Sequence, residues 1–214
     1  GRKLMEDQSL CKKRCGWCQG DEDLIRYHDT EWAVPTHDDK THFEFLTLEI
    51  MQCGLNWRMI LRKRAIINSC FDEFDYQKVA EYGPKEVERI LKTEGMIKNR
   101  RKVSATIQNA RCFLKVIEEF GTFDAYIWKF TDGKPVLYES HKNPGTVIAR
   151  NELSDTISKD LKKRGFQFTG SITVYSFLQA SGIINDHERD CFLDEVIRKK
   201  YPAESVNDLA ITDD

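Results

Sequence analysis

The residue with the most unusual surroundings is Glu49, an acid within the apolar stretch FEFLTLEIMQCGLNW at residues 43–57. If this stretch is helical, Glu49 shares a helix face with residues three or four positions away, which are Phe45, Leu46 and Cys53. Two interpretations are open. Glu49 is either an acid at the edge of an apolar stripe or a carboxylate held in a partly dry pocket, and the second would make it part of a binding site.

A large aromatic ring follows this acid closely. Gly54-Leu55-Asn56 indicates the end of one helix and a cap for the next, and Trp57 then opens the second helix. The sequence therefore places an acid and a flat aromatic ring close together, on either side of the turn between two expected helices.

Cysteine and histidine residues near both ends of the chain have spacings that suit a metal. Cys15 and Cys18 form a C-x-x-C motif, but the residues around it lack the buried strand and following helix that the thioredoxin redox motif needs. A zinc role for at least one of them is the better interpretation, with a plain buried thiol as the alternative. His187 and Cys191 are four positions apart and would point the same way on a helix. With Cys15 and His28 they would complete a closed Cys2His2 site, which is structural because no position remains for water.

Residues 154–182 predict two helices joined by a short turn. We expect a helix capped by Ser154 and running through Arg164, a turn bounded by Gly165 and Gly170, and a second helix over residues 171–180. Such a helix-hairpin-helix directs backbone N–H groups at a phosphate, and the helix dipole assists. An ordinary corner between two helices with a solvated basic end is the alternative.

Side chains around this turn support the same pattern. Spacing predicts burial of three residues in the second helix, Ile172, Tyr175 and Leu178. Three basic side chains stand beside the turn: Lys162, Lys163 and Arg164.

Helical periodicity dominates the rest of the chain. We expect helices at about 38–52, 57–71, 75–82, from Pro84 onward, 98–119 and 122–130. Because β-branched alternation is nearly absent, the predicted fold is all-α. The polar segment 131–153 is expected to be a crossing, a functional loop or a boundary between two lobes.

Composition limits the classes of protein that the chain can represent. Its 214 residues are 40% hydrophobic and 32% charged, and 33 basic against 35 acidic residues give a net charge of -2. This balance argues against a general polyanion coat, although basic clusters occur at 58–64, 98–102 and 159–164, and each could be a solvated helix face. Seven cysteines, no apolar N-terminal segment and no run of about 18 apolar residues predict an intracellular, reduced protein without a membrane span.

Several motifs occur in order along the chain: Cys15-Gly16-Trp17, Tyr27-His28-Asp29, Glu31-Trp32, Val34-Pro35, Leu48-Glu49, Gly54-Leu55-Asn56-Trp57, Lys162-Lys163-Arg164-Gly165-Phe166, Tyr175-Ser176-Phe177 and Asn185-Asp186-His187. Together they resemble 3-methyladenine DNA glycosylase I, from about residue 14 to residue 191. The resemblance implies an all-α helix-hairpin-helix DNA glycosylase fold with two helical lobes and a cleft. A structural zinc site would join the termini.

The resemblance also implies an activity and its residues. It implies hydrolysis of the N-glycosidic bond of N3-methyladenine in alkylated double-stranded DNA, with free 3-methyladenine as the product, during base excision repair. One structural zinc ion would bind Cys15, His28, His187 and Cys191. The base pocket would comprise Glu49, Tyr27, Trp17, Trp32 and Trp57, and contacts to the DNA backbone would fall on Gly165, Gly170, Lys163 and Arg164. We expect a monomer in the cytoplasm or with the chromosome.

The chemistry of the base fits such a pocket. An adenine methylated at N3 is cationic while it is attached to its sugar, so aromatic faces attract it by ~2 kcal/mol when it is desolvated. An ionised Glu49 adds charge-assisted hydrogen bonds, and neutral adenine gains neither contribution. We therefore assign recognition and electrostatic catalysis to Glu49, hydrogen bonding to Tyr27 and stacking to Trp57. Trp17 and Trp32 are either pocket wall or core.

Three places depart from the pattern of the resembled family. Ala33 stands where Gly is common, Leu24 where an aromatic residue is common, and Ile50-Met51 where small or polar residues are usual. These departures bear on substrate range and base affinity. For the domain organisation we expect a flexible leader at 1–13, one glycosylase domain at 14–198 with the helix-hairpin-helix at about 154–182, and a tail at 199–214.

Two functions of other classes compete with this interpretation. A zinc-stabilised DNA-binding module would keep the hairpin and the four ligands without needing Glu49 beside a tryptophan. A cysteine hydrolase is suggested by Gln52-Cys53-Gly54, but Cys53 is expected near the end of an apolar helix without an evident base.

Overall fold

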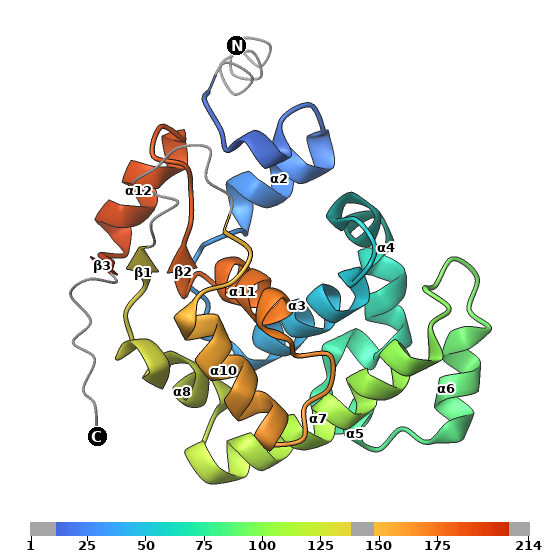
Figure 1. Cartoon of the computed structure of the whole chain (residues 1–214). Coiled ribbons are helices and arrows are strands. Elements are labelled where there is room, and N and C mark those ends of the chain that lie inside the picture. The colour runs from blue at the N-terminus through green and yellow to red at the C-terminus, as the bar shows by residue number, and fades with distance from the viewer. Residues whose placement is uncertain (1–11, 138–147, 206–214) are drawn as a thin grey trace.

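The computed structural model describes residues 12–137 and 148–205 (Figure 1). Most of the leader expected at 1–13, the centre of segment 131–153 and most of the tail expected at 199–214 lie outside these residues. Three short 3-10 helices occur among the described residues: η1 (Gly16–Cys18), η2 (Asp72–Phe74) and η3 (Lys129–Thr131). The α-helices are α2 (Glu22–Thr30), α3 (Asp39–Gln52), α4 (Trp57–Cys70), α5 (Tyr76–Ala80), α6 (Pro84–Leu91), α7 (Arg100–Phe120), α8 (Phe123–Trp128), α10 (Glu152–Lys163), α11 (Ser171–Ala180) and α12 (Phe192–Lys200).

The fold is mostly helical, as the sequence predicts, but it also contains a small sheet. Its strands are β1 (Val136–Leu137), β2 (Ile184–Asn185) and β3 (Glu204–Ser205), and β1 pairs in parallel with both of the others. Strands of two residues carry no alternation, so the all-α prediction missed them. The sheet ties the segment just before His187 to the segment that follows η3.

Local capping explains where most helices begin. The side chains of Asp38, Asn56, Asn99 and Thr122 accept hydrogen bonds from the first turns of α3, α4, α7 and α8. The predicted cap of α10, Ser154, is wrong by three residues. Asn151 is the cap, since its Oδ1 accepts from the N–H of Ser154 at 2.8 Å, and Ser154 Oγ accepts from the N–H of Asn151 at 2.9 Å. Ser154 therefore completes a capping box inside the helix.

The hydrophobic core surrounds α3 and α7. Phe113 of α7 stacks on Phe123 of α8 with ring centroids 4.2 Å apart, and it also meets Phe43 of α3 edge to face. In Figure 1, α3 and α11 lie in the middle of the molecule, between α2 on one side and α7 on the other. Both faces of α3 are consequently buried, including the position of Glu49. Among the described helices, none is long and apolar enough to cross a membrane.

The turn between α10 and α11 is held from several sides. Ser158 Oγ donates to the carbonyl of Thr169 at 2.5 Å, and the hydroxyls of Ser154 and Ser171 are 2.7 Å apart. Tyr175 and Leu178 are buried as predicted, but the predicted burial of Ile172 is wrong, because its side chain is 61% exposed. The first turn of α11 lies at the surface, before the helix enters the core.

Candidate functional site

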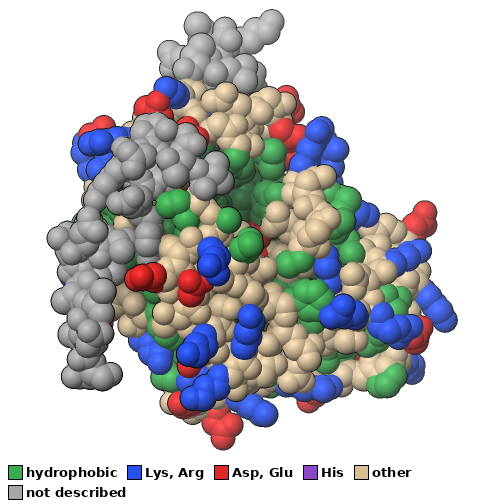
Figure 2. Space-filling view, in the orientation of Figure 1, with side chains coloured by type: hydrophobic (Ala, Val, Ile, Leu, Met, Phe, Trp, Pro, Cys, Tyr) green, Lys and Arg blue, Asp and Glu red, His purple; other side chains and the backbone are tan. Residues whose placement is uncertain are grey.

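A cavity of about 180 Å³ opens where η1, α2, α3, α4 and α11 meet. Cavities of roughly 150 Å³ in other proteins hold benzene, so this one accepts a group of about that size. Figure 2 shows hydrophobic side chains gathered in a hollow between α2 and α4. The cavity is lined by Trp17, Tyr27, Trp32, Glu49, Gln52, Trp57, Ser176 and Gln179.

Glu49 is the acid in this cavity. It lies in the last turn of α3 and is 6% exposed. Burial raises the pKa of its carboxyl from 4.5 to about 8, because the charged form loses its hydration. The structure thus places Glu49 in a partly dry pocket and excludes the solvated edge of a stripe.

Two aromatic residues beside Glu49 carry unpaired polar atoms. Tyr27 of α2 and Trp57 at the start of α4 have ring centroids 5.2 Å apart. Tyr27 Oη and Trp57 Nε1 are both buried without a hydrogen-bond partner among the described residues. Since buried polar groups are normally paired, these two atoms are available to a ligand. Burial, with Glu49 nearby, also raises the pKa of Tyr27, so its hydroxyl remains a donor.

Trp17 and Trp32 complete the aromatic wall. Their rings meet edge to face with centroids 5.0 Å apart, and Trp32 is 8% exposed whereas Trp17 is 39% exposed. Trp32 also contacts the ring of His187 at 4.8 Å. Trp32 thereby connects the cavity to a second cluster of side chains, which could hold a metal ion.

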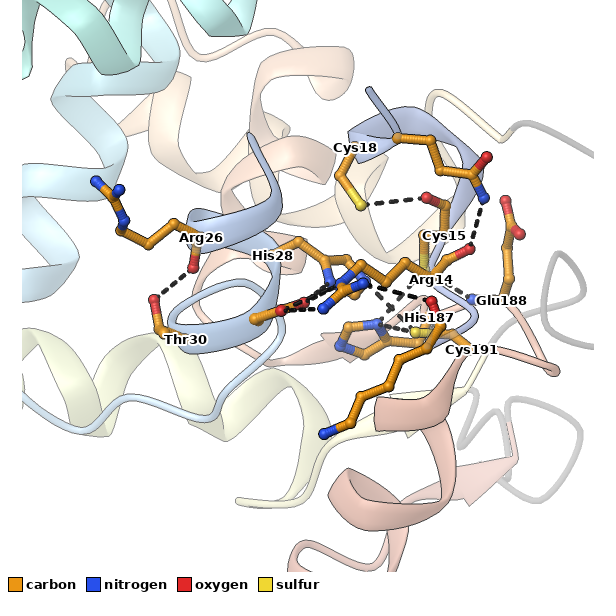
Figure 3. Close-up of polar contacts among 12 residues, drawn as sticks. Arg14, Cys15, Cys18, Arg26, His28, Thr30, His187, Glu188 and Cys191 are labelled. Atoms are coloured by element: carbon orange, nitrogen blue, oxygen red, sulfur yellow. Dashed lines mark hydrogen bonds and ion pairs between the residues drawn. The ribbon is translucent and has the colours of Figure 1, made fainter. Parts of the chain in front are cut away.

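This second cluster consists of two thiols and two imidazoles (Figure 3). The candidate ligand atoms of Cys15, His28, His187 and Cys191 all lie within 4.8 Å of one another, and the four residues are buried. Cys15 precedes η1, His28 lies on α2, and the other two flank a turn before α12. The group therefore brings together the two ends of the described chain.

The distances within this cluster fit a tetrahedral metal. Cys191 Sγ lies 3.4 Å from His28 Nε2 and 3.6 Å from His187 Nδ1, and Cys15 Sγ lies 3.5 Å from His187 Nδ1. Zinc bonds of about 2.3 Å to sulfur and about 2.05 Å to nitrogen place tetrahedral ligands about 3.5 Å apart. The donor set and its spacing are thus those of a closed metal site.

One thiol of the cluster, that of Cys191, is held toward the form that binds a metal. Hydrogen bonds from Cys15 and from the two imidazoles lower the pKa of Cys191 despite its burial. Thiolate is the form that binds metals. His28 Nδ1 lies 2.8 Å from Asp29 Oδ1, so a proton on Nδ1 leaves the lone pair of Nε2 directed at the thiols.

One premise of the metal prediction is wrong. His187 and Cys191 do not lie on a helix, because α12 begins at Phe192. A turn brings them together instead, with the N–H of Cys191 donating to the carbonyl of Glu188 at 2.9 Å. Cys18 stays outside the group and donates its thiol proton to the carbonyl of Cys15. Of the C-x-x-C pair, only Cys15 joins the cluster.

Comparison with known proteins decides the family. The model of the methyladenine glycosylase family matches residues 17–194. The chain belongs to this family.

Relatives of known name agree with this assignment. DNA-3-methyladenine glycosylase 1 of Escherichia coli (strain K12) is 40% identical over 84% of this chain and 95% of its own length. A crystal structure of 3-methyladenine DNA glycosylase I has a TM-score of 0.79 and 40% identity, covering 84% of this chain and 98% of the other. A variant of 3-methyladenine DNA glycosylase I in complex with 3-methyladenine has a TM-score of 0.80 and 31% identity, covering 84% and 96%.

Three residues of this methyladenine glycosylase line the cavity without having been predicted: Gln52, Ser176 and Gln179. Gln179 Nε2 donates to Asp186 Oδ2 at 2.9 Å, and Tyr175 Oη donates to the same oxygen at 2.6 Å. Gln52 follows Glu49 by three positions, and Ser176 and Gln179 are three apart on α11. This spacing, which places residues on one face of a helix, was the available signal. Its use requires knowing that α11 packs on α3.

The residues expected at the DNA backbone have unequal surroundings. Lys163 is exposed at the end of α10, and Gly170 caps α11 without a side-chain hydrogen bond. Gly165 has a φ of +94°, which favours glycine where α10 ends. Arg164 donates to Asp160 at 2.8 Å and to Glu119 at 2.7 Å, so its charge is already compensated within the protein.

The structure gives no support to the cysteine hydrolase alternative. Cys53 Sγ contacts Thr173 Oγ1 at 3.2 Å and the carbonyl of Glu49 at 3.6 Å. Neither partner is a general base.

Proposed function

We propose that this member of the methyladenine glycosylase family hydrolyses the N-glycosidic bond of N3-methyladenine in alkylated double-stranded DNA and releases free 3-methyladenine for base excision repair. The observation that carries the proposal is a cavity of about 180 Å³ that holds the buried Glu49. The unpaired hydroxyl of Tyr27 and the unpaired indole N–H of Trp57 share that cavity. The names of the relatives support the same substrate.

The pocket is suited to a base that has left the DNA helix. The damaged nucleotide is extruded from the stack at a cost of a few kcal/mol, which is lowest for damaged bases. The rings of Trp57, Tyr27, Trp32 and Trp17 then surround a cationic, flat ligand, which stacking and cation–π attraction favour by ~2 kcal/mol. Neutral adenine gains less from the same rings.

Glu49 supplies the charge in this mechanism. A cationic base beside Glu49 favours its ionised form, which opposes the effect of burial on its pKa. The carboxylate then accepts charge-assisted hydrogen bonds from the base edge. Tyr27 is the hydrogen-bond partner and Trp57 the stacking platform.

Bond cleavage needs little acid catalysis because the cationic base is a good leaving group. The sugar–nitrogen bond breaks with its electron pair moving to the base, and water adds a hydroxyl to the sugar carbon while a proton is released. Positive charge passes from the base to the sugar during this step. Glu49 stabilises that charge electrostatically at a site from which most water is excluded.

The four-ligand cluster is proposed to bind one zinc ion. Cys15, His28, His187 and Cys191 would hold it in a closed site, so the ion would supply structure rather than chemistry. His28 lies beside Tyr27 on α2, and Trp32 contacts His187 at 4.8 Å between ring centroids. Metal binding would therefore fix two walls of the base pocket.

DNA binding is proposed to use the turn between α10 and α11 as a helix-hairpin-helix. The open N–H groups after Gly170 would bind a phosphate, with Gly165 shaping the turn and Lys163 adding charge. Arg164 would contribute less to phosphate binding than Lys163, because Glu119 and Asp160 already compensate its charge. The catalytic unit would be a monomer of one domain over residues 14–198.

The first test measures release of free 3-methyladenine from methylated duplex DNA by the wild type, Glu49→Gln and Trp57→Ala. We expect release by the wild type and large losses in both variants. Glu118→Gln is the matched control, since Glu118 is an exposed acid on α7 and should leave release unchanged. A zinc-loaded wild type that binds duplex DNA but releases no base would refute the proposal in favour of a DNA-binding module.

A further inference from the structure

A second hollow lies between the first turn of α7 and the turn that joins α10 to α11. It has a volume of about 700 Å³ and shares no residue with the base pocket. The hollow, called the α7 groove below, is lined by Arg100, Arg101, Ser104, Gln167 and Phe168.

Arg101 is the unusual side chain of the α7 groove. It is exposed, and its guanidinium carbon lies 5.6 Å from the ring centroid of Phe168. Within the described part of the chain Arg101 has no ion pair, whereas the neighbouring Arg100 pairs with Glu88. The ring thus holds a guanidinium whose charge nothing nearby compensates, and this geometry leaves its N–H groups open to an anion.

Phe168 has a strained backbone beneath this arginine. Its φ is 57°, and the left-handed region costs an L-residue about 1–2 kcal/mol. The buried Asn109 holds the strained turn, because Asn109 Nδ2 donates to the carbonyl of Gln167 at 3.0 Å and Asn109 Oδ1 accepts from its N–H at 2.8 Å. Strain that buried polar groups maintain at a surface is typical of a functional site.

The α7 groove lies on the same face as the base pocket. Lys102, the next residue after Arg101, donates from Nζ to the carbonyls of Met51 and Cys53 at the end of the helix that carries Glu49. Thr173, in the first turn of α11, contacts Cys53 at 3.2 Å. Figure 2 shows Lys and Arg side chains over the part of this face where α7 begins. A duplex with one nucleotide in the pocket would therefore extend over the groove.

We propose that the α7 groove binds the sugar–phosphate backbone of the DNA duplex beside the extruded nucleotide, with Arg101 binding a phosphate and Phe168 holding the guanidinium in place. The guanidinium fork matches two phosphate oxygens, which a flexible ammonium does not. This inference rests on the proposed function, since it adds a backbone contact to the same DNA complex. It places the phosphate-binding side chain on α7, beside the turn between α10 and α11 that supplies Phe168.

The test is the salt dependence of DNA binding. A fluorescein-labelled duplex with a tetrahydrofuran abasic-site analogue is titrated with wild type, Arg101→Gln, Arg101→Lys and Lys115→Gln over a range of salt concentrations. Loss of one phosphate contact should weaken binding several-fold and reduce the slope of log K against log salt by about one in Arg101→Gln. Arg101→Lys keeps the charge and should restore most of the slope.

Lys115→Gln is the matched control because Lys115 is an exposed cation on the same helix, 14 residues or about 21 Å further along. It should bind as the wild type does. An unchanged slope in Arg101→Gln would overturn the inference, and so would an equal loss in Lys115→Gln, which would indicate a general effect of net charge. Base release by the same wild-type preparation separates the two proposals: a wild type that releases 3-methyladenine while Arg101→Gln keeps its slope refutes the α7 groove and leaves the glycosylase proposal standing.

Discussion

His28 lies between an acid and a thiol: its Nδ1 is 2.8 Å from Asp29 Oδ1, and its Nε2 is 3.4 Å from Cys191 Sγ. Asp29 in turn accepts from Arg14 Nε and Nη2, both at 2.9 Å. A carboxylate in this position fixes the tautomer and the orientation of a metal-binding imidazole. Asp29 would therefore orient a ligand of the proposed metal site without touching the ion.

Asp29→Ala should weaken zinc binding by about 10–100-fold, the usual effect of losing such a partner. Competition with a chromogenic chelator measures the change. Asp190→Ala is the control, because Asp190 precedes Cys191 but forms an exposed ion pair with Lys13. The Asp190→Ala variant should bind zinc with the affinity of the wild type. Equal zinc affinity in the two variants would contradict a role for Asp29 in orienting His28.

Glu49 should make the folded protein less stable as the pH rises. Its pKa is about 8 when folded and 4.5 in the reference state, so between these values the folded protein holds a proton that the unfolded chain has lost. The free energy of unfolding should then fall by up to about 1.4 kcal/mol per pH unit in this window and level off above it. Below the window both states are protonated and the contribution of the neutral carboxyl is complete.

Urea unfolding of wild type and Glu49→Gln at several pH values isolates this effect. The free energy of unfolding of the wild type should fall relative to that of Glu49→Gln as the pH rises from about 5 to about 8. Glu118→Gln, which changes an exposed acid on α7, should track the wild type. A constant difference between wild type and Glu49→Gln across the range would mean that Glu49 stays ionised in the free protein.

Gly182→Ala should destabilise the protein by more than about 2 kcal/mol. Gly182 has a φ of +75°, and an added Cβ would lie 2.3 Å from the backbone nitrogen of Pro35. Gly121→Ala has the same strain, with a φ of +85°, but open space around the new carbon. Thermal unfolding of both variants separates the clash from the strain, and similar losses would show that the loop before Pro35 yields easily.

Lys102→Met should lower both stability and base release. The buried Lys102 donates to the carbonyls of Met51 at 2.8 Å and Cys53 at 2.5 Å, and losing these donors costs about 1–3 kcal/mol. The turn before Trp57 would also lose its support, while zinc content should not change. Lys98→Met, at an exposed position shortly before α7, is the control. Equal stability of the two variants would show that the carbonyls find water instead.

Local signals were sufficient for much of this fold. Asn56 caps a helix at the predicted place, because capping depends on the residues of one turn, whereas the cap Asn99 lies inside the helix expected at 98–119. The four residues predicted as metal ligands do lie together, although a turn, and not a helix, brings His187 and Cys191 into contact.

Features that depend on packing were not predictable in the same way. Ile172 has the spacing of a buried residue, but its exposure depends on where α11 enters the core. Ser176 and Gln179 reach the cavity because α11 packs on α3, a contact between distant parts of the chain. The contact between the exposed Arg101 and the ring of Phe168 likewise joins distant parts of the chain and could not be read from the sequence.

The cluster of Cys15, His28, His187 and Cys191 also constrains how the protein can be made. Cys15 and His187 are 172 positions apart, so the site cannot close until almost the whole catalytic domain has left the ribosome. Helices in the middle of the chain can form during synthesis, but Cys15 and His28 must wait for the last ligands, and loop closure over this length adds an entropic cost. Metal binding would thus be a late event in biosynthesis, and a chain interrupted before His187 would retain two unmatched ligands and an incomplete pocket wall.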